Sequence, residues 1–226
     1  MKRKPLFLVL MGPQGCGKGT QSEFLTDHFS IPSVTAGGLF REAIHKNNAL
    51  GKKIKALVDQ GGLLPDDLVH KVMKAALGRK AYLNGAIIDG YPRTPEQARL
   101  LDSIVKVSAA IIIQISDQVS VARLTNRLVC EKCGTNYNLR TRKPAVPGVC
   151  DRDGEKLVKR HDDTAPAIRA RLKLYHETTE PVVDYYRKKK IAVAVDGEQP
   201  IVEVHEAIAA ALEDELGIIK SSKVVR

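Results

Sequence analysis

A glycine-rich loop directly after a short apolar run constrains this chain more than any other segment. Residues 12–20 read Gly-Pro-Gln-Gly-Cys-Gly-Lys-Gly-Thr and follow an apolar stretch at residues 6–11. Glycine adopts backbone angles that residues with a Cβ resist, so the loop N–H groups can turn toward phosphate oxygens. A helix predicted to begin near Lys18 adds the positive end of its dipole. The segment therefore predicts a buried strand, a phosphate-binding loop and a helix, as in nucleoside-triphosphate sites.

Lys18 and Thr20 give this loop its candidate chemistry. A lysine at this place supplies a point charge for the β- and γ-phosphates, and a hydroxyl shortly after it can meet the shell of a Mg²⁺ ion. Position 19 is Gly, so the hydroxyl comes one residue later than in the common pattern. Cys16 lies inside the loop, and we interpret it as a small residue tolerated in the turn rather than as a reactive thiol.

Length and charge exclude several classes of protein. A chain of 226 residues suffices for one domain with inserted lobes. No apolar stretch approaches membrane-spanning length, so we expect a cytoplasmic protein without a membrane partner. The formal net charge of +10 suits anionic partners, but the basic residues are spread along the chain and Trp is absent. This pattern favours a nucleotide site with a solvated basic surface over a nucleic-acid-binding surface.

Short apolar runs alternate with amphipathic segments along the chain. Nearly continuous apolar runs suit a parallel sheet buried on both faces, and they predict strands at residues 6–11, 86–89, 109–115 and 191–195. Amphipathic patterns predict helices at residues 18–29, 38–46, 50–60, 66–77, 95–105, 117–129, 165–189 and 200–215. The alternation predicts β-α-β crossovers and an α/β three-layer fold, with helices on both faces of the sheet.

Two regions interrupt the alternation and predict inserted units. Residues 35–64 hold helices and almost no strand, which indicates a small helical lobe. Residues 130–163 are rich in Cys, Gly, Pro and charge and are too long for a plain connection. The remaining segments, 1–34, 65–129 and 164–226, would form the core domain.

Cysteine spacing predicts what stabilises the second insert. The pattern is Cys130-x-x-Cys133, sixteen intervening residues, and Cys150-x-x-Asp153. Two such knuckles are typical of a structural zinc ribbon, in which three thiolates and a carboxylate close a tetrahedral site. Asp151 is an alternative fourth ligand, although the x-x spacing favours Asp153. A disulfide or a redox pair is the alternative reading, and it is disfavoured in a cytosolic protein.

Cationic residues near the predicted strand ends suit phosphoryl transfer, which needs positioning, Mg²⁺ and positive charge. Asp89 ends a predicted strand and precedes Gly90-Tyr91-Pro92-Arg93. In a phosphate-loop protein, a strand-terminal Asp commonly holds Mg²⁺-bound water. Arg123 and Arg127 are four residues apart, so we expect them to share a helix face. Further candidate cations are Arg160, near the end of the insert, and Arg171, on the helix predicted after it.

Taken together, these motifs resemble the adenylate kinase family, in order and over nearly the whole chain. The resemblance rests on residues 12–21, 89–94 and 160–163, on the cysteine-rich insert and on Arg171. It implies a monomeric nucleoside-monophosphate kinase that reversibly transfers the γ-phosphoryl group of MgATP to AMP, giving two ADP. Residues 35–64 would be the monophosphate-binding lobe and residues 130–163 the lid. Mg²⁺ would accompany ATP, and Zn²⁺ would be structural in the lid.

The resemblance also implies roles for individual residues. ATP would contact Gly12, Gly15, Cys16, Gly17, Lys18, Gly19, Thr20, Arg123, Arg127 and Gln199. AMP would contact Ala36, Arg41, Leu63, Leu64, Gly90, Arg93, Gln97, Arg160 and Arg171. Catalysis would rest on Lys18, Asp89, Arg93, Arg127, Arg160 and Arg171. Within these sets, Gln97 would read the acceptor base, Asp89 would order Mg²⁺-bound water, and Asp162 would help to close the lid.

The acceptor lobe departs from the family pattern. Where adenylate kinases typically read Ser-Thr-Gly-Asp, this chain reads Thr35-Ala36-Gly37-Gly38. Ala36 removes a possible hydrogen bond worth ~0.5–1.5 kcal/mol and resembles UMP/CMP kinases, whereas Gln97 follows the adenylate kinase pattern. Gly38 removes a carboxylate near a helix start, so we expect that helix to begin less firmly. AMP is the favoured acceptor; a UMP/CMP or relaxed kinase, and a nucleotide- or RNA-binding protein without turnover, remain alternatives.

Overall fold

The fold is built around a five-stranded parallel sheet. The computed structural model describes residues 4–59, 64–160 and 163–216, and the strand order is β2-β3-β1-β4-β8. The strands are β1 (Leu6–Met11), β2 (Ser33–Thr35), β3 (Gly85–Asp89), β4 (Ala109–Gln114) and β8 (Ala192–Asp196). The central strand β1 pairs with β3 and β4, and Leu10 lies opposite Asp89. The loop after β1 and the end of β3 therefore meet at one edge of the sheet.

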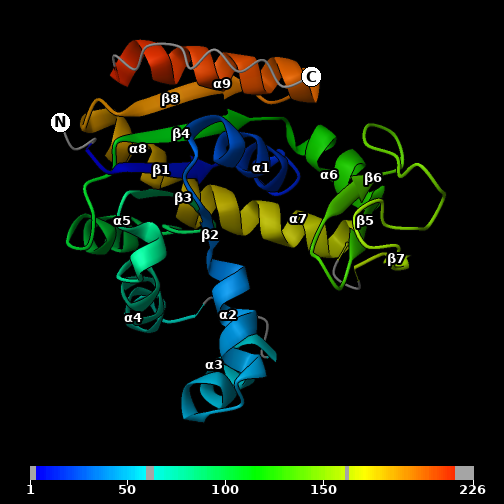
Figure 1. The fold of residues 1–226 in the computed structure, drawn as a ribbon, viewed down its shortest axis with the longest axis horizontal. Coiled ribbons are helices and arrows are strands. Elements are labelled where there is room, and N and C mark those ends of the chain that lie inside the picture. The colour runs from blue at the N-terminus through cyan, green and yellow to red at the C-terminus, as the bar shows by residue number, and fades with distance from the viewer. Residues whose placement is uncertain (1–3, 60–63, 161–162, 217–226) are drawn as a thin grey trace.

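Helices cover both faces of this sheet, which confirms the predicted three-layer α/β fold (Figure 1). One face packs against α1 (Lys18–Phe29) and α9 (Ile201–Leu216). The other packs against α4 (Asp66–Leu77), α5 (Pro95–Asp102) and α8 (Glu180–Lys188). Successive strand residues point to opposite faces, so a strand buried on both sides must be apolar throughout. This requirement explains the continuous apolar runs in the sequence.

Two inserts project from the sheet layer. The first is the helix pair α2 (Ala36–His45) and α3 (Ala49–Asp59), which extends away from the sheet (Figure 1). The second is a three-stranded antiparallel sheet of order β6-β5-β7, at the end of the molecule opposite α5 (Figure 1). Its strands are β5 (Arg127–Cys130), β6 (Asn136–Asn138) and β7 (Leu157–Val158).

Helices connect the second insert to the sheet layer. The chain enters the insert from α6 (Asp117–Thr125) and leaves it through α7 (Ala165–Leu174). A π-helical turn (Tyr175–Thr179) joins α7 directly to α8, as the single helix predicted for residues 165–189 requires. A short 3-10 turn at Lys80–Tyr82 precedes β3. None of the helices in the described part of the chain is long and apolar enough to cross a membrane.

The prediction of a helix over residues 117–129 is wrong beyond Thr125. The side chain of Asn126 folds back onto the carbonyl oxygen of Ala122, and the chain then turns into β5. Leu128 packs against the small apolar cluster of the insert. If the helix continued, the cluster would lose this side chain. Arg123 and Arg127 therefore lie on a helix and a strand and do not share a helix face.

Differences at the acceptor lobe are smaller. The sequence predicted no strand directly before the lobe, but Ser33–Thr35 form β2 and pair with β3. Helix α2 begins at Ala36, two residues before its predicted start. The Thr35 hydroxyl accepts a hydrogen bond from the Gly38 N–H at 3.0 Å. Thr35 thus caps this helix in place of a carboxylate at position 38.

Candidate active site and lid metal centre

The loop between β1 and α1 is closely fitted to its neighbours. Gly12 has a φ of +140°, and a Cβ at this position would lie 2.3 Å from the carbonyl oxygen of Ile113 in β4. Gly17 takes the left-handed conformation at the start of α1, with a φ of 98°. Only glycine meets both requirements at position 12, where the backbone angle and the close approach coincide. The sequence prediction of a strand, a tight loop and a helix is confirmed.

Lys18 reaches back over this loop. Its Nζ donates hydrogen bonds to the carbonyl oxygens of Gly12 at 2.7 Å and Pro13 at 2.9 Å. The same nitrogen lies 3.4 Å from the Sγ of the buried Cys16. The ammonium group is therefore held above the N-terminus of α1, where backbone N–H groups and the helix dipole also favour an anion.

A pocket opens beside this loop and gathers distant parts of the chain. Residues from the end of β1, the loop, the segment after β3 and the π-helical turn line it. Its polar members are Gln14, Lys18, Arg93, Thr178 and Thr179. Two predicted catalytic residues, Lys18 and Arg93, thus face the same cavity at the carboxyl ends of parallel strands, where α/β proteins bind ligands.

Asp89, the last residue of β3, and Arg93, four residues later, place opposite charges at this edge of the sheet. Burial raises the pKa of Asp89, and the positive charges of Lys18 and Arg93 oppose that rise. Burial also lowers the pKa of the Arg93 guanidinium, and Asp89 counteracts this change. Arg93 Nε donates to the carbonyl oxygen of Gly90 at 3.0 Å. Asp89, Lys18 and Arg93 therefore form one electrostatic unit.

Gln97 lies in a network that the sequence did not predict. Its Oε1 accepts a hydrogen bond from the backbone N–H of Arg93 at 2.7 Å, and its Nε2 donates to Asp66 at 2.7 Å. The other Asp66 oxygen accepts from the Thr94 hydroxyl at 2.9 Å. Thr94 also caps α5. The network ties the first residue of α4 to the first turn of α5.

Arg127 and Arg171 meet on a single carboxylate. Asp163 accepts two hydrogen bonds from Arg127, at 2.8 and 2.7 Å, and one from Arg171 at 3.1 Å. The Asp163 side chain is only 3 % exposed. The sequence analysis placed the two arginines together but assigned lid closure to Asp162, which lies outside the described residues. The sequence analysis gave Asp163 no role. The signal that could have found it is a carboxylate that lies between Arg160 and Arg171 in the sequence.

The remaining predicted contacts lie around the same edge. Arg123 is half-buried on α6, and Gln199 bonds Asp196 just after β8 at 2.7 Å. On the lobe side, Ala36 and Leu64 are buried. The other described members of the predicted sets are half-buried Gly15, Thr20 and Gly90 and exposed Gly19, Arg41 and Arg160. Leu63, the remaining predicted acceptor contact, lies outside the described residues.

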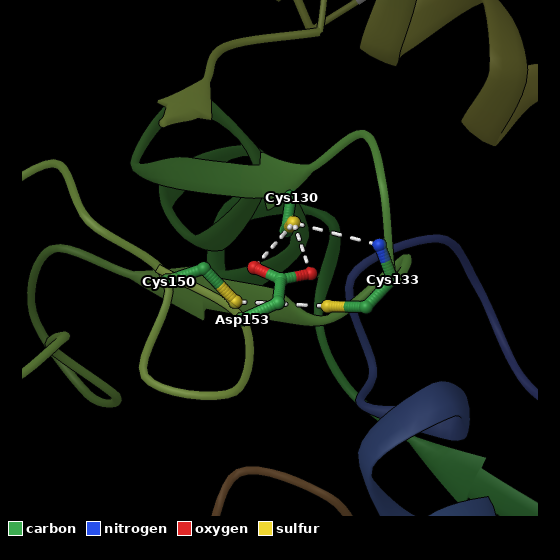
Figure 2. A group of neighbouring side chains, drawn as sticks. All are labelled: Cys130, Cys133, Cys150 and Asp153. Carbon is green, nitrogen blue, oxygen red and sulfur yellow. Dashed lines mark hydrogen bonds between the residues drawn. The ribbon is translucent and has the colours of Figure 1, made fainter. Parts of the chain in front are cut away.

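The four predicted metal ligands converge in the second insert (Figure 2). Their ligand atoms lie within 4.8 Å of one another, and they belong to Cys130, Cys133, Cys150 and Asp153. Cys130 Sγ is 3.3 and 3.4 Å from the two Asp153 oxygens, and Cys133 Sγ is 3.6 Å from Cys150 Sγ. Two sulfur atoms bound tetrahedrally to one zinc ion at about 2.3 Å would be about 3.8 Å apart. The cluster could therefore hold a metal ion such as zinc.

Matching backbone turns present these ligands. In the first knuckle the N–H of Gly134 donates to Cys130 O at 2.9 Å, and in the second the N–H of Gly154 donates to Cys150 O at the same distance. Both glycines have positive φ, 76° and 72°. The fourth member of the cluster is Asp153, whereas the Asp151 carboxylate accepts from the backbone N–H of Ala145 at 2.9 Å. Asp153 thus occupies the position of a second cysteine in its knuckle.

A phosphate-binding loop at the centre of a parallel sheet, with Lys18 and Arg93 lining a pocket at the same edge, defines a phosphotransferase of the nucleoside-monophosphate kinase class. Comparison with known proteins agrees, because the family model described as adenylate kinase matches residues 10–191. The chain belongs to the adenylate kinase family.

Individual relatives that match this chain over most of their length are also named adenylate kinase. A protein of Clostridium tetani named adenylate kinase is 38 % identical over 210 residues, covering 91 % of this chain and 97 % of the relative. A Thermotoga maritima adenylate kinase is 44 % identical over 197 residues, covering 84 % and 90 %. A Caldanaerobacter subterraneus adenylate kinase is 39 % identical over 210 residues, covering 91 % and 95 %.

Proposed function

We propose that this protein reversibly transfers the γ-phosphoryl group of MgATP to AMP, giving two molecules of ADP. The observation that carries the proposal is that Lys18 and Arg93 line one pocket at the carboxyl ends of β1 and β3. The positive charges of both residues also act on Asp89 at the end of β3. The names of the relatives support the choice of AMP, and so does Gln97 in the first turn of α5.

Positive charge around two polyanions is the main requirement of this reaction. The loop N–H groups and Lys18 would hold the donor phosphates, while Arg41 and Arg93 would hold the phosphate of the acceptor. Arg127, Arg160 and Arg171 would surround the transferring group. In a water-poor site, such fixed charges stabilise the transition state without reorganising during the reaction.

Asp89 and Thr20 are the residues that would hold the Mg²⁺ ion that accompanies ATP. A buried carboxylate and a hydroxyl beside a phosphate loop are oxygen donors of the kind that Mg²⁺ prefers, mostly through its bound waters. The ion would neutralise charge on the donor phosphates. No side chain need remove a proton, because the acceptor phosphate is itself nucleophilic.

Water must be excluded from such a site, since it would otherwise compete with AMP for the phosphoryl group. We propose that residues 35–64 act as the monophosphate-binding lobe and residues 130–163 as the lid, both closing on the core of the remaining segments. We propose a monomer, as the family resemblance implies.

We propose that the cysteine cluster of the lid binds structural Zn²⁺. Three thiolates and one carboxylate suit zinc, and the closed set leaves no ligand position for chemistry. The apolar cluster of this insert is small, formed by Cys130, Tyr137, Cys150 and Leu157 with Leu128 beside them. Metal binding would supply folding free energy that so small a core cannot. We propose that the protein works in the cytoplasm, where thiols are kept reduced and can bind the metal.

The test is product formation from MgATP with AMP, CMP, UMP or GMP offered separately, using a method that resolves the nucleotides. Fast ADP formation with AMP alone is expected. Comparable or better turnover of CMP or UMP would move the assignment to a pyrimidine or relaxed kinase, as Ala36 suggests on its own. Absence of transfer to every acceptor would overturn the kinase proposal in favour of a binding protein.

A further inference from the structure

Asp66 and the backbone of Arg93 hold the Gln97 amide from its two ends. The N–H of Arg93 donates to Gln97 Oε1, and Gln97 Nε2 donates to Asp66 Oδ1, each at 2.7 Å. Gln97 is only 3 % exposed, so water cannot replace a hydrogen-bond partner that its amide loses. The second Asp66 oxygen is occupied by the Thr94 hydroxyl, which fixes the carboxylate in turn.

This arrangement allows one orientation of the amide. A backbone N–H only donates and an ionised carboxylate only accepts. If the amide turned over, its NH₂ would face the N–H of Arg93 and its oxygen would face Asp66, so both contacts would become repulsive. Each contact leaves the amide with further capacity, because its oxygen has a second lone pair and its nitrogen a second hydrogen. Gln97 therefore presents an acceptor and a donor in a fixed order.

Nucleotide bases fall into two classes by the order of the same two groups. Adenine and cytosine carry an exocyclic amine, a donor, beside a ring nitrogen that accepts. Guanine and uracil carry an exocyclic oxygen, an acceptor, beside a ring N–H that donates. An amide with a fixed orientation pairs with one class, whereas an amide that can turn over pairs with either.

We propose that Asp66 is a positioning residue that sets the class of acceptor base by fixing the Gln97 amide. It selects bases with an amine beside an unprotonated ring nitrogen and rejects those with a carbonyl beside a ring N–H. The inference rests on the proposed kinase function, in which Gln97 reads the acceptor base. It separates the pyrimidine alternatives, since CMP belongs to the selected class and UMP to the rejected one.

The test is Asp66→Asn in the full chain, assayed with AMP against GMP and with CMP against UMP. Asparagine can donate as well as accept, so one of the two contacts that oppose turning of Gln97 disappears. The ratio of kcat/KM for AMP over GMP is expected to fall about tenfold, the effect of one poorly paired buried polar group. The KM for ATP should stay unchanged, and Asp66→Glu, which keeps a carboxylate, should preserve the ratio.

Asp67→Asn is the matched control. Asp67 is the next residue of α4, and its side chain is 74 % exposed and 3.9 Å from Lys71. This variant should keep the wild-type ratio. If Asp66→Asn does not fold, Asp66→Ser provides the same test, because a hydroxyl also donates or accepts.

Equal losses with all acceptors in the folded variant would show a merely structural role and overturn the inference. An unchanged ratio would overturn it as well. A wild-type protein that transfers to no acceptor would instead overturn the proposed function, so the two failures are distinguishable.

Discussion

At the scale of single residues, the site is a set of charges that the backbone holds in place. Lys18 is the clearest case, since carbonyl oxygens of its own loop fix the ammonium group. Asp163 does the same for two arginines from β5 and α7. Such prior fixing means that little reorganisation accompanies phosphate binding, which is how preorganised charges lower a barrier.

Replacing Lys18 tests this view of the loop. We expect Lys18→Ala to lower kcat/KM by about 10²–10³ or more, the typical effect of losing one preorganised stabilising group. The melting temperature should change little, because the Lys18 hydrogen bonds are local to the loop. Steady-state kinetics and thermal denaturation check both points, with exposed Lys106→Ala as the control. Activity within tenfold of wild type would remove Lys18 from the phosphate-binding role.

Sequence alone identified most charged groups of the site but not all of their supports. The phosphate loop and the ligand spacing are local patterns, so Lys18 and the cysteines could be found by inspection. Asp66 could not, because its partners Thr94 and Gln97 lie 28 and 31 residues away along the chain. The spacing already favoured Asp153 over Asp151, and the structure adds that the Asp151 carboxylate accepts from the backbone N–H of Ala145.

At the scale of elements, the sheet of the second insert has only a small apolar core, so we expect its proposed metal site to stabilise it. We expect one metal ion per chain and a lower melting temperature after treatment with a strong chelator, because metal binding is coupled to folding of such units. Asp153→Ala should weaken metal binding at least tenfold. Asp151→Ala should not, since the Asp151 carboxylate accepts from the backbone N–H of Ala145 and is not part of the cluster. Metal analysis by atomic emission during competition with a chelator measures both variants.

His176 joins two further elements. In the π-helical turn, its ring bonds Glu180 at 2.8 Å and Asp117, the first residue of α6, at 3.0 Å. Hydrogen bonds that the protonated ring donates to Glu180 and then to Asp117 raise the His176 pKa above its ordinary value of 6.5. The stabilising contribution is therefore complete below pH 6.5 and is lost as the pH rises through the folded-state pKa.

Denaturant unfolding at pH 6 and pH 8 tests this expectation. His176→Gln should lower the free energy of unfolding more at pH 6 than at pH 8. The difference should be small, because the side chain is 45 % exposed and solvent screens its ion pairs. An equal loss at both pH values would show that protonation of His176 does not contribute to stability.

The misplaced end of α6 shows what local patterns omit at this scale. Residues 117–125 are helical as predicted, but Arg127 to Cys130 form a strand because they meet β6 and β7 there. Those partners come from residues 136–158, beyond the window that a helical pattern can sense. Tertiary pairing overrides local propensity in such short segments.

At the scale of the whole molecule, the lid touches the phosphate-loop helix. Arg142 of the lid lies 3.4 Å from Glu23 of α1, and Asn136 lies near Gly19. The pair is partly exposed, at 35 % and 47 % for the two side chains. A pair of this kind contributes about 0.2–1 kcal/mol, which would favour the proposed closure of the lid without locking it.

Glu23→Gln should therefore raise the KM for ATP by roughly 1.5- to 5-fold, the factor that corresponds to such a pair. If lid opening limits turnover, kcat should stay equal or rise, and its dependence on solvent viscosity should weaken. Lys132→Ala is the control, because the Lys132–Glu155 pair lies entirely within the lid. An identical response of turnover and of single-turnover chemistry to viscosity would exclude opening as the limiting step.

The alternation of strands and helices predicted the layers, but strand order could not be read from it. An apolar run indicates that a strand is buried on both faces, but it does not indicate which strands lie next to it. The structure places the first strand in the middle, between β3 and β4, and this choice brings the phosphate loop beside Asp89.

The central place of β1 has a consequence for how the chain is made. Leu6 pairs with Gly85 and Leu8 with Ala109, so β1 leaves the ribosome well before either of its partners, β3 and β4. Pairings of such long range close slowly. The lid strands pair within a short stretch of chain, from Arg127 to Val158. During synthesis the three-stranded sheet can therefore form as soon as its own residues have emerged. The sheet edge that holds the phosphate loop and Asp89 forms only after β3 and β4 have emerged.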